Sequence, residues 1–133
     1  MEARGLRLLS LDGGGVRGLS TLLILERLMR KVNLESPPKP CDYFDMIGGT
    51  STGGLIAIML GRLRMSIPDC IQAYLELADE VFDKKRHRFS YGGKVQGRFD
   101  AKALEHAIKK VLQDQNLNED ELLKAPEDGR CKV

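Results

Sequence analysis

The segment GTSTG, residues 49–53, constrains the fold of this chain more than any other stretch. It follows one short apolar run, residues 43–48, and precedes another, residues 55–60. A strand, a tight glycine-rich turn and a helix in this order form a nucleophile elbow, a turn that exposes a serine. The segment therefore predicts that the Ser51 hydroxyl lies at the mouth of a sheet.

The residues beside Ser51 suit this turn. A sharp strand-to-helix turn leaves no room for a Cβ next to the serine, which is why Gly49 and Gly53 fit there. The N–H group of Thr52 would lie at a helix N-terminus, where unpaired donors and the helix dipole favour an anion. We therefore predict Ser51 as a nucleophile toward an acyl carbon and the Thr52 amide as a donor to the oxyanion.

A second glycine-rich segment, DGGGVRG at residues 12–18, follows an apolar run that predicts a buried, parallel strand over residues 6–11. Successive glycines allow consecutive backbone N–H groups to point at one spot. Each hydrogen-bond donor aimed at a developing negative charge raises the reaction rate by a factor on the order of 10²–10³. The segment is thus interpreted as an oxyanion loop, with these candidate donors: Gly13, Gly14 and Gly15.

Two charged residues of this loop have expected roles of their own. Asp12 can brace the turn by accepting a backbone N–H, and Arg17 can hold the shape of the loop or attract an anionic head group.

The same loop formally satisfies the dinucleotide pattern G-x-G-x-x-G through Gly13, Gly15 and Gly18. That interpretation needs a second strand that ends in an acidic residue about 20 positions further on. Residues 33–40 instead hold a proline cluster with no strand before it. Residues 48–54 also lack the Gly-Lys-Ser/Thr ending of a Walker A loop. A nucleotide-binding α/β module therefore stays as the weaker alternative.

Three further segments have the spacing of helices. The first covers residues 19–32, and Glu26 and Arg30 are four residues apart on its polar side. Its apolar residues recur at helical intervals: Leu19, Leu22, Leu23, Leu25, Leu28, Met29 and Val32. The second is expected to begin at Ser66 as N-cap, with a proline in the first turn. The third is expected after Asp100 as N-cap.

Residues 83–98 are predicted to form a loop, because glycines interrupt any periodicity there. Its basic residues are Lys84, Lys85, Arg86, Arg88, Lys94 and Arg98. They favour either contact with anionic lipid head groups, at about 1 kcal/mol per basic residue, or a solvated surface. Further on, residues 118–121 resemble a capping box and predict a short last helix.

Composition narrows the classes of function. The 133 residues suffice for one domain. A net charge of +2, no Trp and 5% aromatic residues argue against a nucleic-acid partner. The three cysteines, Cys41, Cys70 and Cys131, lack metal-ligand spacing, so we expect reduced thiols, no metal and no cofactor. With no apolar run near the ~20 residues of a membrane span, a cytoplasmic protein, peripheral at most on membranes, is expected.

The two glycine-rich motifs together, LDGGGVRG at residues 11–18 and GTSTGG at residues 49–54, resemble those of the patatin-like phospholipases. The resemblance covers roughly residues 6–112. It implies a three-layer α/β fold in which a central, mostly parallel sheet lies between helices. It also implies hydrolysis of lipid acyl esters by a Ser-Asp dyad, with Ser51 as nucleophile and the glycine-loop amides as oxyanion hole.

The family's catalytic aspartate belongs to a later Asp-Gly-Gly or Asp-Gly-Ala motif. The one later Asp-Gly here, at Asp128, is followed by Arg130 in a polar tail and does not fit. His87 and His106 are expected at the surface, and Asp45 is expected to face a helix or solvent. Without an activating base a serine is a poor nucleophile, so the isolated chain is expected to be weakly active or inactive.

We therefore expect residues 1–133 to be the N-terminal part of a larger patatin-like domain, with the sheet incomplete at the C-terminus and flexible flanks at residues 1–5 and 113–133. Residues 131–133 would begin the next strand. The expected function is lipid acyl hydrolysis with the dyad aspartate outside this chain. A catalytically dead remnant that binds lipid or protein is the alternative from another class.

Overall fold

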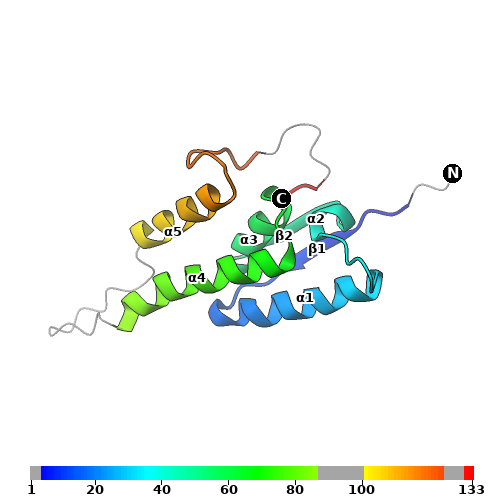
Figure 1. The fold of residues 1–133 in the computed structure, drawn as a ribbon, viewed down its shortest axis with the longest axis horizontal. Helices are drawn as coiled ribbons and strands as arrows, with labels where there is room; N and C mark the ends of the chain where they lie inside the picture. The colour runs from blue at the N-terminus through cyan, green and yellow to red at the C-terminus, as the bar shows by residue number, and fades with distance from the viewer. Residues whose placement is uncertain (1–3, 87–100, 125–130) are drawn as a thin grey trace. The chain divides into compact units, whose positions relative to one another are not determined.

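The computed structural model describes residues 4–86, 101–124 and 131–133. The chain divides into two compact units, one formed by Met1–Ile71 with Leu122–Val133 and the other by the residues between them. Figure 1 shows the elements of both units along the chain. In order they are β1 (Leu8–Leu11), the 3₁₀ helix η1 (Gly15–Arg17), α1 (Gly18–Val32), α2 (Pro40–Tyr43), β2 (Met46–Gly49), α3 (Thr52–Ala57), the π-helix η2 (Ile58–Arg62), α4 (Ile67–Arg86) and α5 (Ala101–Asp114).

The sheet of the first unit is parallel. β1 pairs with β2 in a register that places Leu8 opposite Met46 and Leu11 opposite Gly49. On the other side of β2, Met46 forms a parallel bridge with Lys132. Ile47 N donates to the Lys132 carbonyl at 2.8 Å, and Lys132 N donates to the Asp45 carbonyl at 2.9 Å. Residues 131–133 therefore pair with β2 where the sequence predicts the first residues of a further strand.

One face of this sheet is buried, and the other is exposed. Leu11 and Ile47 point into the core with 4% and 0% of their surface exposed. Leu8, three residues before Leu11, and Met46, next to Ile47, lie on the opposite face and are 64% and 46% exposed. This alternation follows from the two-residue period of a strand. α3 contacts both strands, and the expected α/β class with a parallel sheet is confirmed.

α1 buries a narrower stripe than its sequence predicts. Gly18, Leu22, Leu25 and Met29 are buried. Leu19 is half-buried, and the other large apolar side chains, at positions 23, 24, 28 and 32, are exposed. The predicted pair of Glu26 and Arg30 is present, with 3.3 Å between Oε1 and Nη2.

The second unit contains most of α4 and all of α5. Lys110 lies 3.4 Å from Glu76, and His106 lies 3.8 Å from Glu80. These pairs run in opposite directions along the two helices, so α4 and α5 are antiparallel. Residues 83–86 belong to α4, so the prediction of a loop is wrong there: the helix continues into the first basic residues. The rest of the expected loop, from residue 87, lies outside the described residues, as does Asp100.

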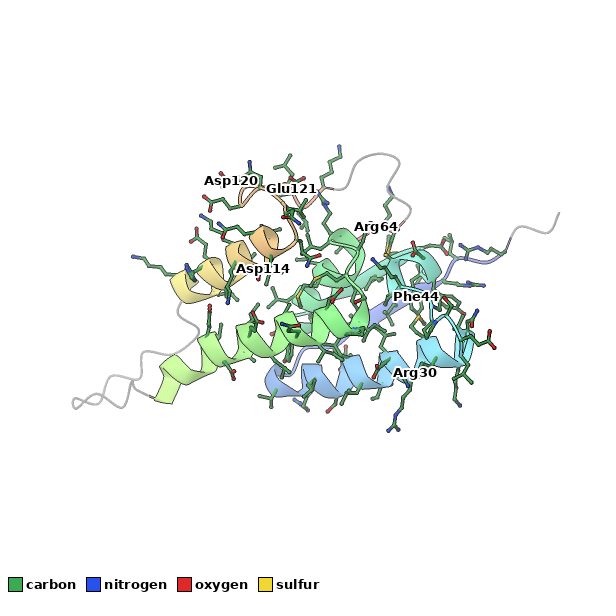
Figure 2. The ribbon with its side chains drawn as sticks, viewed as in Figure 1. Arg30, Phe44, Arg64, Asp114, Asp120 and Glu121 are labelled. Carbon is green, nitrogen blue, oxygen red and sulfur yellow. The ribbon has the colours of Figure 1, made fainter. Side chains whose placement is uncertain are left out.

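The short last helix predicted at residues 118–121 is wrong. These residues form a turn in which Glu121 N donates to the Asn118 carbonyl at 3.0 Å. The Asn118 side chain accepts from Asp120 N at 3.0 Å, and Figure 2 labels Asp120 and Glu121 in this turn. An asparagine side chain that bonds to the backbone two residues on favours a turn over a helix.

Candidate active site

Ser51 lies between the end of β2 at Gly49 and the start of α3 at Thr52. Its backbone has φ 54° and ψ −128°, a conformation that L-residues rarely adopt. The turn is held by hydrogen bonds from Gly54 N to the Ser51 carbonyl, at 2.9 Å, and from Gly53 N to the Thr50 carbonyl, at 3.0 Å. The side chain of Ser51 is exposed. The structure thus has a strained strand-to-helix turn at the position where the sequence predicts an elbow.

The two glycines of the elbow lie against β1 and against each other. A Cβ at Gly53 would collide with the Leu11 carbonyl oxygen and lie 2.7 Å from the Leu11 carbonyl carbon. A Cβ at Gly49 would lie 2.5 Å from the Gly53 carbonyl and 2.7 Å from the Leu11 oxygen. Real Cβ atoms do not approach backbone so closely, and both positions therefore require glycine.

The glycine loop lies next to Ser51. A Cβ at Gly13 would lie 2.7 Å from Ser51 Cβ and 3.4 Å from Ser51 Oγ. Gly14 and Gly15 have φ of 155° and 58°, which only glycine adopts readily. The structure thus brings together residues that are almost 40 positions apart in the sequence.

The first two amides of the loop have partners in this structure. Gly13 N donates to Thr50 Oγ1 at 3.3 Å, and Gly14 N donates to Thr52 Oγ1 at 3.2 Å. The two threonines are the immediate neighbours of Ser51 in the chain. Sequence reasoning missed this role, because a hydroxyl that binds a distant loop leaves no periodic signal.

Arg17 and Asp12 differ in what they do for the loop. Arg17 donates to the Gly14 carbonyl from both its backbone N, at 3.3 Å, and its Nε, at 3.4 Å. It therefore holds the shape of the loop, one of its two expected roles. Asp12 is exposed, and within the described ranges its carboxylate accepts no hydrogen bond. The expectation that Asp12 braces the turn is wrong, because the two threonines do so.

No base is in place beside Ser51 in the part of the chain that the structure describes. The Ser51 hydroxyl forms no hydrogen bond with those residues. His106 is exposed, as expected, and lies near Glu80 in the second unit. His87 and Asp128 lie outside the described residues.

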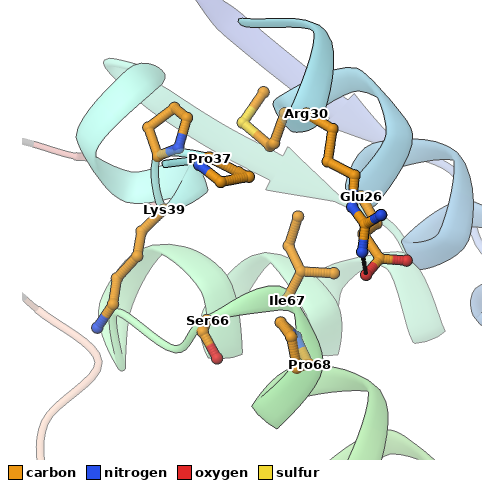
Figure 3. A pocket seen from close by; sticks show the side chains of 9 residues that line it. Glu26, Arg30, Pro37, Lys39, Ser66, Ile67 and Pro68 are labelled. Atoms are coloured by element: carbon orange, nitrogen blue, oxygen red, sulfur yellow. Dashed lines mark hydrogen bonds and ion pairs between the residues drawn. The ribbon is translucent and has the colours of Figure 1, made fainter. Parts of the chain in front are cut away.

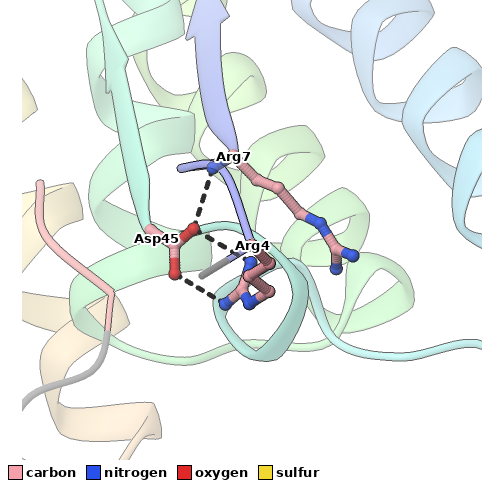
Figure 4. Close-up of polar contacts among 3 residues, drawn as sticks. All are labelled: Arg4, Arg7 and Asp45. Atoms are coloured by element: carbon pink, nitrogen blue, oxygen red, sulfur yellow. Dashed lines mark hydrogen bonds and ion pairs between the residues drawn. The ribbon is translucent and has the colours of Figure 1, made fainter. Parts of the chain in front are cut away.

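Asp45 is engaged elsewhere, contrary to the expectation that it faces a helix or solvent. Its carboxylate accepts hydrogen bonds from Arg7 N at 2.8 Å and from both terminal nitrogens of Arg4, at 2.8 and 3.1 Å (Figure 4). The backbone hydrogen bond from Arg7, followed by that from the Arg4 guanidinium, lowers the pKa of Asp45 below its usual value. The ionised carboxylate of Asp45 thus links the N-terminal segment to the start of β2, and we call this link the Asp45 tie.

A pocket of about 230 Å³ lies away from the elbow, between α1, the proline segment and the start of α4 (Figure 3). Its lining residues are Glu26, Met29, Arg30, Pro37, Pro38, Lys39, Ser66, Ile67 and Pro68. None of them belongs to the elbow or the glycine loop, so this pocket is not where Ser51 would act.

The three cysteines are buried and unpaired. Burial raises the pKa of each thiol, and raises that of Cys70 to about 12. Such thiols stay protonated at neutral pH and are poor nucleophiles. Within the described ranges, no three His, Cys, Asp or Glu residues are grouped to hold a metal ion. No helix there is long and apolar enough to cross a membrane.

The parallel sheet and the helices that follow its strands place this chain among α/β proteins. The family model for patatin-like phospholipase matches residues 9–130. The chain therefore belongs to the patatin-like phospholipase family.

Relatives of known name agree with this assignment. The chain is 40% identical to human calcium-independent phospholipase A2-gamma over 63% of its own length and 10% of that protein. It is 33% identical to Patatin-07 of Solanum tuberosum over 84% of its own length and 30% of that protein. The chain thus spans about a third or less of the curated relatives it matches. No solved structure matched it.

Proposed function

We propose that this chain carries the nucleophile and oxyanion loop of a lipid acyl hydrolase. The observation that supports this most is the exposed Ser51 at φ 54°, with the glycine loop beside its hydroxyl. Two relatives named above are a phospholipase A2 and a patatin, which favours acyl esters of phospholipids or related lipids as substrates.

In the proposed reaction, Ser51 Oγ attacks the carbonyl carbon of the ester while its proton passes to a base. The resulting oxyanion would be held by the Thr52 N–H and the amides of the glycine loop, Gly13, Gly14 and Gly15. The alcohol then leaves with a proton, and water hydrolyses the acyl-serine. Arg17 shapes the loop and is exposed beside it, where a lipid phosphate would be attracted.

The base would be an aspartate outside this chain, supplied by the remainder of a longer protein. Two observations support this part of the proposal: Ser51 Oγ has no partner among the described residues, and the chain covers a small share of its relatives. Peripheral membrane contact through residues 84–98, and a cytoplasmic location, belong to the same proposal.

The lack of a base beside Ser51 among the described residues also favours a second candidate, a catalytically dead patatin-like remnant that binds lipid or protein. The sequence that follows Val133 discriminates between the two. An Asp-Gly-Gly or Asp-Gly-Ala motif there supports the enzyme, and its absence supports the remnant. A nucleotide-binding module has less support, because the matching family model and the relatives named above are patatin-like phospholipases.

The test is Ser51→Ala in the full-length protein that carries this chain. We expect loss of phospholipid hydrolysis and of covalent labelling by a fluorophosphonate, with wild-type stability retained. Ser20→Ala, an exposed serine on α1, is the matched control and should leave both unchanged. Undiminished hydrolysis by Ser51→Ala would show that Ser51 is not the nucleophile.

A further inference from the structure

Two hydrogen bonds tie the glycine loop to the elbow, and they bracket Ser51. Thr50 precedes the serine and accepts from Gly13, while Thr52 follows it and accepts from Gly14. Consecutive residues of the loop thus bind alternate residues of the elbow. The backbone adds a parallel tie, since Thr50 N donates to the Leu11 carbonyl at 3.1 Å.

The burial of Thr52 indicates that its hydroxyl is placed for this contact. Thr52 is 7% exposed and is the one buried polar residue found within the described ranges. A buried hydroxyl without a partner destabilises a fold. Its bond to Gly14 removes that penalty and also fixes the loop.

The lengths of the two bonds suit a temporary partner. At 3.3 and 3.2 Å they lie at the long end for N–H···O bonds. Hydrogen bonds to an ionised oxygen are shorter and roughly twice as strong. A developing oxyanion next to Ser51 would therefore compete well with the threonine hydroxyls for these amides.

We propose that Thr50 and Thr52 are positioning residues, which satisfy the Gly13 and Gly14 amides in the resting state, keep the loop against Ser51, and release the amides to the oxyanion. We call the two hydrogen bonds from Gly13 and Gly14 to the threonine hydroxyls the resting clamp. The catalytic part of this inference rests on the proposed function, whereas the resting clamp does not. In this proposal the two threonine side chains act only through the Gly13 and Gly14 amides, whereas the Thr52 backbone N–H keeps its separate proposed role as a donor to the oxyanion.

The resting clamp is tested in this chain by amide hydrogen exchange, observed by NMR. Thr50→Val should speed exchange about tenfold at Gly13, as expected for one lost hydrogen bond, and leave Gly14 nearly unchanged. Thr52→Val should do the reverse. Thr50→Ser and Thr52→Ser keep the hydroxyl and should bring each exchange rate to within about threefold of the wild-type rate. These serine variants can still be measured if a valine variant fails to fold.

The catalytic part is tested in the full-length protein with a phospholipid substrate. Each valine variant should lower kcat about tenfold with KM within about twofold, and each serine variant should recover most of kcat. Ser20→Ala serves again as the control. A merely structural role would not give this division between kcat and KM together with rescue by serine.

The outcomes separate the two proposals. If amide exchange at Gly13 is unchanged in Thr50→Val, and exchange at Gly14 is unchanged in Thr52→Val, the clamp is overturned, whatever the activity. If both valine variants keep the wild-type kcat, or change only KM, the catalytic role is overturned. Hydrolysis that does not depend on Ser51 overturns the proposed function but leaves the exchange result to decide the clamp.

Discussion

At the scale of single residues, the elbow depends on glycines, because their lack of a Cβ allows close backbone contacts. Gly53 lies against the Leu11 carbonyl, and Gly13 lies against Ser51, so any Cβ would push the glycine loop and the elbow apart. Gly48, one residue before the end of β2, has nothing within 4 Å of its would-be Cβ. Glycines close together in the sequence therefore differ in what they permit.

Gly53→Ala should lower the free energy of unfolding by about 1–3 kcal/mol, because the added methyl group meets backbone that cannot move easily. Gly48→Ala is the matched control and should change stability by less than about 1 kcal/mol, in the stabilising direction. Urea unfolding followed by circular dichroism measures both. Equal effects of the two substitutions would contradict the tight packing at Gly53.

The tie at Asp45 makes stability depend on pH. Its pKa is lowered in the folded state from an ordinary value of 3.8, because Arg7 N and Arg4 bind the ionised form. Its contribution is therefore complete above pH 3.8 and is lost as the pH falls through the lower folded value. Urea unfolding between pH 2.5 and 7 should show that the stability gap between wild type and Asp45→Asn closes toward the acid end.

Arg7→Ala provides the control for that measurement, because it keeps the backbone N–H that Asp45 accepts. It removes the contact of the Arg7 guanidinium with the Tyr43 ring, 4.2 Å from its centroid. This variant should lose stability at all pH values and retain most of the dependence. A gap between wild type and Asp45→Asn that stays constant down to pH 2.5 would rule out the tie.

At the scale of elements, a local capping pattern predicted the start of one helix and failed at another. α4 begins as expected, with Ser66 Oγ accepting from Asp69 N at 3.2 Å and donating to the Asp69 carboxylate at 2.6 Å. At residues 118–121 a similar pattern gave a turn, because Asn118 bonds to the backbone just ahead of it. A capping pattern predicts a helix only where an apolar stripe follows to be buried.

Ser66→Ala should destabilise the chain by about 1 kcal/mol, since the N-terminal amides of α4 lose their side-chain acceptor. Ser36→Ala, in an exposed bend before the proline segment, is the matched control and should have an effect within about 0.5 kcal/mol. Thermal unfolding detects the difference. A Ser66→Ala variant as stable as Ser36→Ala would show that the cap contributes nothing.

At the scale of the whole chain, the sequence predicted the parallel sheet and the elbow, because strand, glycine turn and helix are local patterns. It did not predict which hydroxyls bind the loop amides, nor that Asp45 ties down the N-terminal segment. Those contacts join residues some 40 positions apart, and a polar side chain without periodicity does not reveal its partner. The narrow stripe of α1 was missed for a related reason, since helical spacing does not say how much of an apolar face is covered.

Deletion of residues 131–133 should lower the free energy of unfolding by roughly 2 kcal/mol, because the backbone hydrogen bonds to Asp45 and Ile47 and the buried Cys131 are lost. Lys132→Ala keeps both backbone bonds and should change stability by less than about 0.5 kcal/mol. Chemical denaturation compares the two. A deletion without effect would mean that these residues do not pair with β2 in solution.

The backbone conformation of Ser51 has one more consequence, which concerns how thermal stability is balanced against a chemical role of the side chain. At φ 54° and ψ −128° the main chain is in a region that glycine enters freely and that serine and alanine enter only under strain. Ser51→Gly should therefore have a higher melting temperature than Ser51→Ala, although both variants lack the hydroxyl. If so, selection has kept at this position an amino acid that weakens the molecule, and only a use for its oxygen would explain why glycine has not replaced it.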